Sequence, residues 1–212
     1  RIPSITGKVI PEAIFSKRNY LNTIYEKIKS DIAPFDPDNV LNPIWVNSRG
    51  AIPRFDRGSI EIRLMDIQEC PTADMAIISL VIETIKAFVR EKFISLDEQM
   101  KMKTDPLASL FEKCMVTGQK TEVSHPEFLA AFGIKAGSMT AIDVWKTVMD
   151  KLVKSGNSAL EKWTPELSVI LNEGTLSDRI IRALGQDTSE ESIKNTYRKL
   201  CGCLAQNKMF IL

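Results

Sequence analysis

The spacing of apolar residues changes several times along the chain, and each change predicts a different structural element. Between residues 14 and 32 apolar side chains recur three and four positions apart, which is the spacing of one face of an α-helix. Pro11 suits the first turn of such a helix, and Pro34 marks a position before which it should stop. We therefore expect one amphipathic helix between these two prolines.

Between residues 42 and 67 the apolar residues alternate with polar ones, which is typical of β-strands. Residues 44–47 predict a first strand, and residues 59–65 predict a second, more regular one. Asp56-Arg57-Gly58 predicts a turn between them, since glycine readily adopts positive φ. This region is therefore expected to form a β-hairpin.

Everything after Pro71 is expected to be helical. Residues 75–93 begin apolar on nearly all sides, as in a helix packed under a sheet. Helix starts, each a Ser or Thr followed three residues later by an acid, occur at residues 95, 124, 140, 175 and 188. The sequence thus predicts a mostly helical α+β fold. Because a lone hairpin is marginally stable, we expect it to belong to a larger antiparallel sheet completed by missing sequence or a second chain.

The composition is that of a globular protein: 212 residues, 44% hydrophobic, 26% charged, with a net charge of +1. This length predicts a single domain over residues 1–212, or the carboxy-terminal part of a larger catalytic domain. Balanced charge argues against nucleic acid as a partner, and no run is long and apolar enough to predict a membrane span. Four cysteines and no recognisable signal peptide favour free thiols in the cytoplasm.

Candidate chemistry concentrates on the second strand of the hairpin, where alternate residues share a face. Glu61 and Arg63 lie on one face, and the other face is aliphatic. We expect the aliphatic face to pack against the helix over residues 75–93. The aliphatic residues are Ile60, Ile62 and Leu64.

Three further arginines, Arg49, Arg54 and Arg57, surround the same hairpin. Guanidinium groups match phosphate oxygens, and a neighbouring carboxylate such as that of Glu61 can bind Mg²⁺. The alternative is an ordinary salt bridge on a solvated strand, which contributes little to stability. The register is open: a three-residue turn sets Arg54 on the aliphatic face, whereas a β-bulge brings it across.

Residues 42–71 resemble the signature of the glutamate–cysteine ligase type 2 family, the bacterial carboxylate–amine ligases. The run reads NPIWVNSRGAIPRFDRGSIEIRLMDIQECP, in which a Glu-x-Arg strand precedes an Asp and then a long apolar helix. Residues 10–12 and the Gly-Thr-Leu-Ser-Asp-Arg run at 174–179 are also similar to that family. The resemblance implies that the chain is the carboxy-terminal half of a glutamine synthetase-like fold.

The resemblance further implies an ATP-dependent carboxylate–amine ligase of glutathione biosynthesis. ATP would convert the γ-carboxylate of glutamate into an acyl phosphate, and an amine such as that of cysteine would then attack it. Arg63 would be catalytic, the other three arginines would bind ATP phosphates, and Glu61 would bind Mg²⁺ or Mn²⁺. The Glu-rich strands that supply most metal ligands in that fold are absent, so the chain alone is expected to be inactive.

Two other functions are compatible with the sequence. A guanidino phosphotransferase-like enzyme also lines a sheet with ATP-binding arginines, but it should contain a reactive cysteine in a defined loop. Cys70 has no His or Lys near it in sequence, which favours a structural thiol. The second alternative is a helical interaction module without catalysis, whose hairpin docks onto the sheet of a partner.

Overall fold

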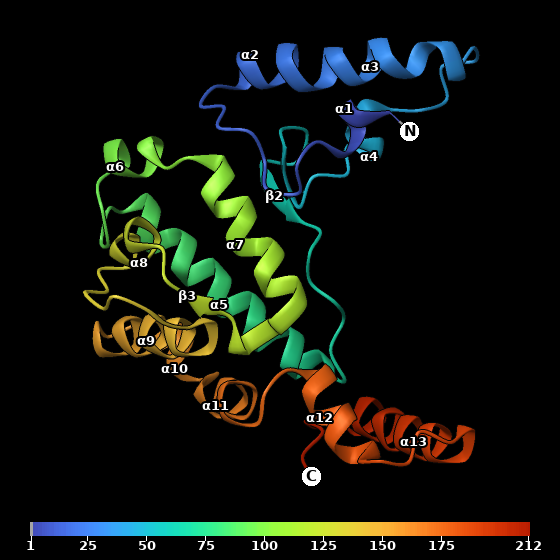
Figure 1. Cartoon of the computed structure of the whole chain (residues 1–212), viewed down its shortest axis with the longest axis vertical. Helices are drawn as coiled ribbons and strands as arrows, with labels where there is room; N and C mark the ends of the chain where they lie inside the picture. Colours follow the sequence, from blue (N-terminus) through green and yellow to red (C-terminus); the bar gives the residue numbers. More distant parts are fainter. Residues whose placement is uncertain (1) are drawn as a thin grey trace. The chain divides into compact units, whose positions relative to one another are not determined.

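The structure is a computed structural model that describes residues 2–212, and it divides the chain into two compact units (Figure 1). The first unit comprises residues 1–66 and 97–113, and the second comprises residues 67–96 and 114–212. Helices predominate, and the strands of the described residues form two two-stranded antiparallel sheets. This confirms a mostly helical α+β class, while further strands beside the hairpin stay a prediction.

A nearly continuous helical stretch forms one side of the first unit. It begins after Ser16, whose side chain accepts a hydrogen bond from the Asn19 amide at 3.2 Å, and therefore starts later than Pro11 predicted. It also runs through Pro34, because a proline fits the first turn of the closing 3₁₀ segment. Its segments are α2 (Lys17–Tyr20), a π-helical turn (Leu21–Tyr25), α3 (Glu26–Ile32) and a 3₁₀ turn (Ala33–Phe35).

The core of the first unit lies along the apolar side of this stretch. Short helix α1 (Pro3–Thr6), helix α4 (Pro43–Val46) and the hairpin gather on that side (Figure 1). The rings of Tyr20 and Tyr25 meet edge to face with centroids 5.4 Å apart, a favourable aromatic geometry. The buried core residues are Tyr20, Ile24, Tyr25, Ile28 and Ile32.

The predicted first strand is wrong, because residues 43–46 form helix α4. Asn42 caps this helix by accepting a hydrogen bond from the Ile44 amide at 2.9 Å, and Pro43 occupies the first turn. Over four residues, two alternating apolar side chains fit a helical turn as well as a strand. The cap and the proline favour the helix.

The hairpin consists of β1 (Ala51–Arg54) and β2 (Ser59–Ile62), which pair with Ala51 opposite Ile62 and Arg54 opposite Ser59. The expected turn is confirmed, with Gly58 at φ +60°. Strand β1 was missed because it contains Pro53, which cannot donate to a ladder. The proline is tolerated here because Pro53 lies opposite Ile60 in a non-hydrogen-bonded pair, where no N–H is needed for pairing with β2. Its carbonyl oxygen accepts from the Tyr25 hydroxyl at 3.3 Å.

The two faces of the hairpin are reversed relative to the prediction. Ile52, which is fully buried, lies opposite Glu61, so the charged face is the one turned toward the core of this unit. The aliphatic residues on the other face are exposed, so the expectation that they form a buried face is wrong. Their exposed fractions are 59% for Ile60, 37% for Ile62 and 46% for Leu64.

The second unit is built around α5 (Pro71–Val89), which confirms the predicted long helix. One side of α5 contacts α9 (Ala141–Lys154), α10 (Ser158–Glu161) and α11 (Thr164–Glu173). Small residues on α5, including Ala73, Ala76 and Ala87, are buried in this packing. The remaining elements of this unit are a 3₁₀ turn (Gly118–Lys120), β3 (Glu122–Val123), α8 (Pro126–Ala131), β4 (Met139–Thr140), α12 (Leu176–Leu184) and α13 (Glu190–Gln206). Most of α6 (Leu96–Lys101) and α7 (Thr104–Thr117) belongs to the first unit, which includes residues 97–113.

Most of the helix starts predicted from the sequence lie within one residue of the observed N-cap residue of a helix. Thr175 forms a complete capping box, in which its hydroxyl accepts from the Asp178 amide and the Asp178 carboxylate accepts from the Thr175 amide. Thr140 caps α9 in the expected place. The caps of α8 and α13 are His125 and Ser189, one residue after those predicted, because imidazole nitrogen and serine hydroxyl can both accept from the helix start.

Candidate functional site

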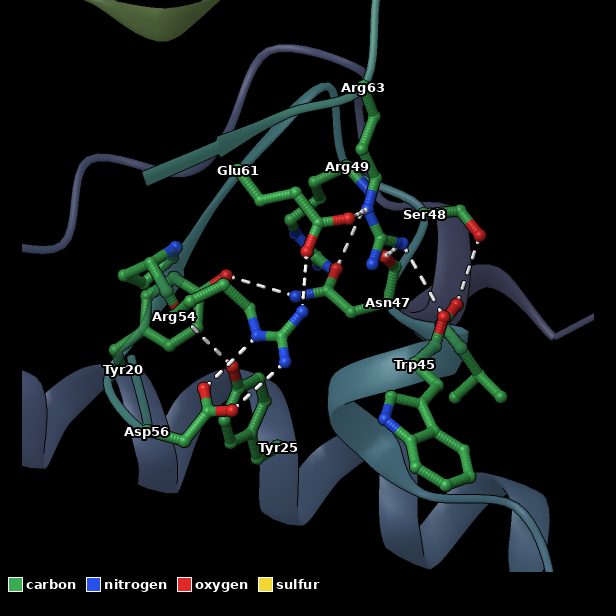
Figure 2. Close-up of polar contacts among 12 residues, drawn as sticks. Tyr20, Tyr25, Trp45, Asn47, Ser48, Arg49, Arg54, Asp56, Glu61 and Arg63 are labelled. Atoms are coloured by element: carbon green, nitrogen blue, oxygen red, sulfur yellow. Dashed lines mark hydrogen bonds and ion pairs between the residues drawn. The ribbon is translucent and has the colours of Figure 1, made fainter. Parts of the chain in front are cut away.

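The hairpin brings Arg54, Glu61 and Arg63 together on its inner face (Figure 2). The four-residue turn places Arg54 opposite Ser59, on the same face as Glu61, so no bulge is required. Arg54 Nη1 donates to Glu61 Oε2 at 2.7 Å, and Arg63 Nε donates to Glu61 Oε1 at 2.8 Å. Each oxygen of one carboxylate is thus held by a different guanidinium.

These contacts fix the charge state of Glu61. The hydrogen bond from Arg54, followed by that from Arg63, holds the pKa of the Glu61 carboxyl below its ordinary value, against a smaller effect of burial. The carboxylate is therefore ionised at neutral pH. It supplies a negative charge between two positive ones and accepts a charge-assisted hydrogen bond from each.

Arg54 is buried and its guanidinium is fully engaged. Besides Glu61, it binds Asp56 through two parallel hydrogen bonds, Nε to Oδ1 at 3.0 Å and Nη2 to Oδ2 at 2.9 Å. Asp56 and then Glu61 raise the pKa of Arg54, and Arg54 in turn lowers the pKa of Asp56. With all three nitrogens paired, Arg54 is suited to hold Glu61 in position.

Arg63 joins β2 to the end of α4. Its Nη1 donates to the carbonyl oxygens of Asn47 and, at 3.4 Å, of Trp45. These carbonyls lie at the carboxy-terminal end of α4, where a cation is electrostatically favoured. Nη2 of Arg63 has no hydrogen-bond partner among residues 2–212, and 26% of the side chain is exposed.

Arg49 is buried nearby, and its hydrogen bonds go to residues other than Glu61. It forms a two-pronged ion pair with Glu12, Nε to Oε2 at 2.5 Å and Nη2 to Oε1 at 2.6 Å. Its Nη1 donates to Ser4 O and Asn47 Oδ1, both at 3.0 Å. Asn47 completes the chain by donating to the Tyr20 hydroxyl at 3.0 Å. Arg49 therefore has a structural environment, and its predicted phosphate contact finds no support in this geometry.

Glu12 and Asn47 were not selected from the sequence as site residues. Burial raises the pKa of Glu12, but the hydrogen bond and charge of Arg49, together with a backbone hydrogen bond, outweigh it, and the pKa is lowered overall. Glu12 and Arg49 line a cavity of about 460 Å³ together with residues of α1 and α3. For Glu12 a signal existed, because residues 10–12 belong to the resemblance, whereas Asn47 had none.

Arg57 is at the tip of the hairpin. Its side chain is exposed, and Nε lies 3.6 Å from Asp56 Oδ2. The structure thus places the four predicted arginines in three different settings. Arg54 and Arg63 hold Glu61, Arg49 holds Glu12, and Arg57 is exposed to solvent.

A divalent metal requires more ligands than this hairpin supplies. Among residues 2–212 no group of three or more His, Cys, Asp or Glu side chains could hold a metal ion. Both oxygens of Glu61 already accept from arginines. Glu61 could therefore supply at most one ligand, and the described residues do not form a metal site by themselves.

Arg179, in the second part of the family-like sequence, lies in the core of the second unit. Its Nη1 donates to Glu69 Oε1 at 2.5 Å and to the Phe210 carbonyl oxygen at 2.6 Å. The Phe210 amide donates back to Glu69 Oε1 at 2.9 Å. Both charged side chains are fully buried, so Arg179 joins α12, the start of α5 and the C-terminal tail and is inaccessible to a substrate.

Cys70 is buried beside this ion pair, and burial raises the pKa of its thiol. A raised pKa reduces the thiolate fraction and makes the sulfur a poor nucleophile. This agrees with the structural role expected for Cys70. It also weakens the comparison with guanidino phosphotransferases.

Comparisons with known proteins identify one relative without an assigned function. The chain is 28% identical over 213 residues to an uncharacterized protein from Archaeoglobus fulgidus; the match covers 99% of this chain and 49% of the relative. The chain thus spans about half the length of that protein. No protein-family model matches the sequence, and no solved structure matches it. No helix within residues 2–212 is both long and apolar enough to cross a membrane.

Proposed function

We propose that this chain is the carboxy-terminal half of an ATP-dependent carboxylate–amine ligase of the glutamate–cysteine ligase type 2 kind. The observation that carries the proposal is the placement of Arg54 and Arg63 on either side of Glu61, on one face of the hairpin. The alternation of the strand predicts such a shared face, and the Glu-x-Arg resemblance implies the roles of Glu61 and Arg63. The half-length match to the archaeal relative supports a site that is completed by further sequence.

In this proposal the arginines have different roles. Arg63 contacts the transferred phosphoryl group, since its Nη2 is unpaired among the described residues and its side chain is partly exposed. Arg54 is a positioning residue, because its three nitrogens are already bound to carboxylates. Arg57, exposed at the tip of the hairpin, would contact the outer phosphates, since its ion pair with Asp56 is loose at 3.6 Å.

The reaction proceeds in two balanced steps. The γ-phosphoryl group of ATP passes to a carboxylate, most simply the γ-carboxylate of glutamate, and ADP leaves. An amine then attacks the acyl carbon, and inorganic phosphate departs as the amide bond forms. Arg63 stabilises the charge that develops on the transferred phosphoryl group, and preorganised contacts of this kind are worth about 3 kcal/mol or more.

Magnesium or manganese would be the metal that accompanies ATP in such a ligase. Glu61 is the described residue suited to bind it, through an oxygen released from one of its arginines. The remaining ligands would come from outside the 212 residues, which is why the chain alone is expected to be inactive.

The proposal is tested with Arg63→Ala and Arg63→Lys in the intact protein, by measuring ADP release with glutamate and a panel of amines. We expect Arg63→Ala to lower kcat by about 100-fold or more, because one stabilising donor pair is lost from the transition state. Arg63→Lys keeps the charge but lacks the planar fork, so it should restore only part of the rate. Arg198→Ala, an exposed arginine of α13, is the matched control.

Thermal unfolding separates a catalytic effect from a structural one. Arg63 is partly exposed, and Glu61 keeps Arg54 when it is removed, so the unfolding temperature should change little. Wild-type ADP release by a folded Arg63→Ala variant would refute the phosphate role. An intact protein that does not bind ATP would refute the ligase itself and favour the non-catalytic interaction module.

A further inference from the structure

The carbonyl oxygen that binds Arg63 belongs to a peptide unit that is held from both sides. Arg63 Nη1 donates to the Asn47 carbonyl oxygen, and the Ser48 amide of the same peptide unit donates to the Ile5 carbonyl oxygen at 2.9 Å. Because a peptide unit is planar, fixing the direction of its N–H also fixes the direction of its C=O. The orientation of the Arg63 guanidinium therefore depends on the position of α1, which contains Ile5.

Arg49 ties α1 to Asn47. Its Nη1 donates to the Ser4 carbonyl oxygen and to Asn47 Oδ1, both at 3.0 Å. Ser4 directly precedes Ile5 in α1, so this contact also holds the acceptor of the 47–48 peptide unit in place. The other two nitrogens, Nε and Nη2, bind the two carboxylate oxygens of Glu12. One guanidinium thus joins α1, the residue that ends α4 and the loop that contains Glu12.

These contacts are buried around Asn47, which contacts both arginines (Figure 2). Asn47 is fully buried, and its Nδ2 donates to the Tyr20 hydroxyl at 3.0 Å. Only 3% of the Arg49 side chain is exposed. Hydrogen bonds in such a low-dielectric environment are stronger than in water, so the network holds its members in one arrangement. A guanidinium this enclosed cannot reach a phosphate, but it can set the direction of one that does.

We propose that Arg49 is a positioning residue that orients the guanidinium of Arg63 through Asn47. Glu12 holds Arg49 in turn. With Nε of Arg63 bound to Glu61 and Nη1 bound to Asn47, the remaining Nη2 is directed toward the place of the phosphoryl group. The catalytic consequence rests on the proposed function, whereas the fixing of Arg63 does not. This role replaces the direct phosphate contact that the sequence predicted for Arg49.

NMR relaxation of the Arg63 Nε–Hε group in the intact protein tests the positioning without any substrate. Arg49→Lys keeps a cation beside Glu12 but lacks the planar fork that reaches Ser4 and Asn47 together, so we expect the Arg63 group to become more mobile. The matched control is Arg198→Lys, the same change at an exposed arginine, which should leave that group as in the wild type.

A pair of variants at residue 47 provides a second measurement that does not alter Arg49 itself. Asn47→Leu is similar in size but removes the acceptor for Arg49, so it should also mobilise the Arg63 group. Asn47→Asp keeps an acceptor oxygen and should preserve the order of the wild type. Unchanged mobility of Arg63 in folded Arg49→Lys and Asn47→Leu would overturn the proposal.

A double-mutant cycle with Arg63→Ala tests the catalytic consequence. We expect Arg49→Lys to lower kcat by about 10- to 100-fold with little change in KM for ATP, because misplacing a group by about 1 Å can cost about 100-fold. In the Arg63→Ala background the same change should cost little more, since its effect passes through Arg63. Equal losses in both backgrounds would overturn this role. A raised KM with unchanged kcat would also overturn it, by indicating direct contact of Arg49 with ATP.

The ligase and the positioning role can fail separately. If the intact wild type does not bind ATP, the ligase and the catalytic consequence are both refuted, and the relaxation of Arg63 still decides the positioning. If Arg63→Ala lowers kcat as expected but Arg49→Lys leaves kcat and the mobility of Arg63 unchanged, the ligase stands and the positioning role is wrong.

Discussion

Replacement of Arg179 by methionine should be among the most destabilising single changes in the second unit. Methionine approximates the aliphatic part of the arginine side chain but leaves the Glu69 carboxylate buried without its cation. It also removes the donor that binds the Phe210 carbonyl oxygen. Because both charged side chains are fully buried, solvent cannot take over the lost contacts.

The size of the effect follows from this burial. Removing one partner of a buried ion pair costs about 3–5 kcal/mol, mainly because the remaining charge is left uncompensated. For a domain of this size, 1 kcal/mol corresponds to a shift of about 2–4 °C in Tm, so we expect a decrease on the order of 10 °C. Replacing both Glu69 and Arg179 by methionine should cost less than Arg179→Met alone, since no unpaired charge then remains.

Urea unfolding followed by circular dichroism at pH 7 measures the free energy of unfolding. The control is Arg182→Met on the same helix, whose exposed guanidinium binds Glu173 at the surface. This change should alter the free energy of unfolding by about 0.5 kcal/mol or less. If Arg179→Met were no more destabilising than Arg182→Met, the buried pair would not have the role that its geometry indicates.

The dependence of this effect on pH gives an independent check. Burial raises the pKa of Glu69, but Arg179 and the Phe210 amide outweigh it, so the folded-state pKa lies below the unfolded value of about 4.3. The carboxylate therefore stabilises the fold above that unfolded value, and the contribution is lost as the pH falls through the folded one. In Arg179→Met the pKa of Glu69 should be raised instead, because the carboxylate is buried without its cation. The difference in free energy of unfolding between this variant and the wild type should therefore become smaller as the pH is lowered below neutrality.

Three further experiments test the hairpin and the thiols. Gly50→Ala should lower the free energy of unfolding by about 1–3 kcal/mol, because the new Cβ would lie 2.3 Å from Leu64 Cδ1 and 2.9 Å from Val9 O. The control Gly137→Ala should be nearly neutral, because a Cβ at residue 137 would have no atom within 4 Å. Arg54→Met should raise the pKa of Glu61 in a carboxyl NMR titration, and an unchanged pKa would contradict the assignment of Arg54 as its main partner. In thiol labelling of the folded protein, exposed Cys201 should react first and Cys70 last, because burial raises the pKa of Cys70 and blocks access; equal rates would argue against the buried position.

The sequence by itself determined those elements whose signals are local. Thr175 with Asp178 marks a helix start because the capping contacts lie within one turn. The long apolar helix α5 and the turn at Gly58 follow from periodicity and from the freedom of glycine at positive φ. The alternation in β2 likewise predicted that Glu61 and Arg63 share a face, because period two is a property of the strand itself.

The tertiary structure decided which contacts those residues make. Alternation distinguishes the two faces of a strand, but it does not state which face a helix will cover, and here the core packs against the charged face beside Ile52. Strand β1 forms despite Pro53 because the register leaves the position of its missing N–H unpaired with β2, and the hydroxyl of Tyr25, 28 residues earlier, donates to its carbonyl oxygen. The ion pairs of Arg49 with Glu12 and of Arg179 with Glu69 join residues 37 and 110 positions apart. Such pairings depend on the path of the whole chain, and no local pattern contains them.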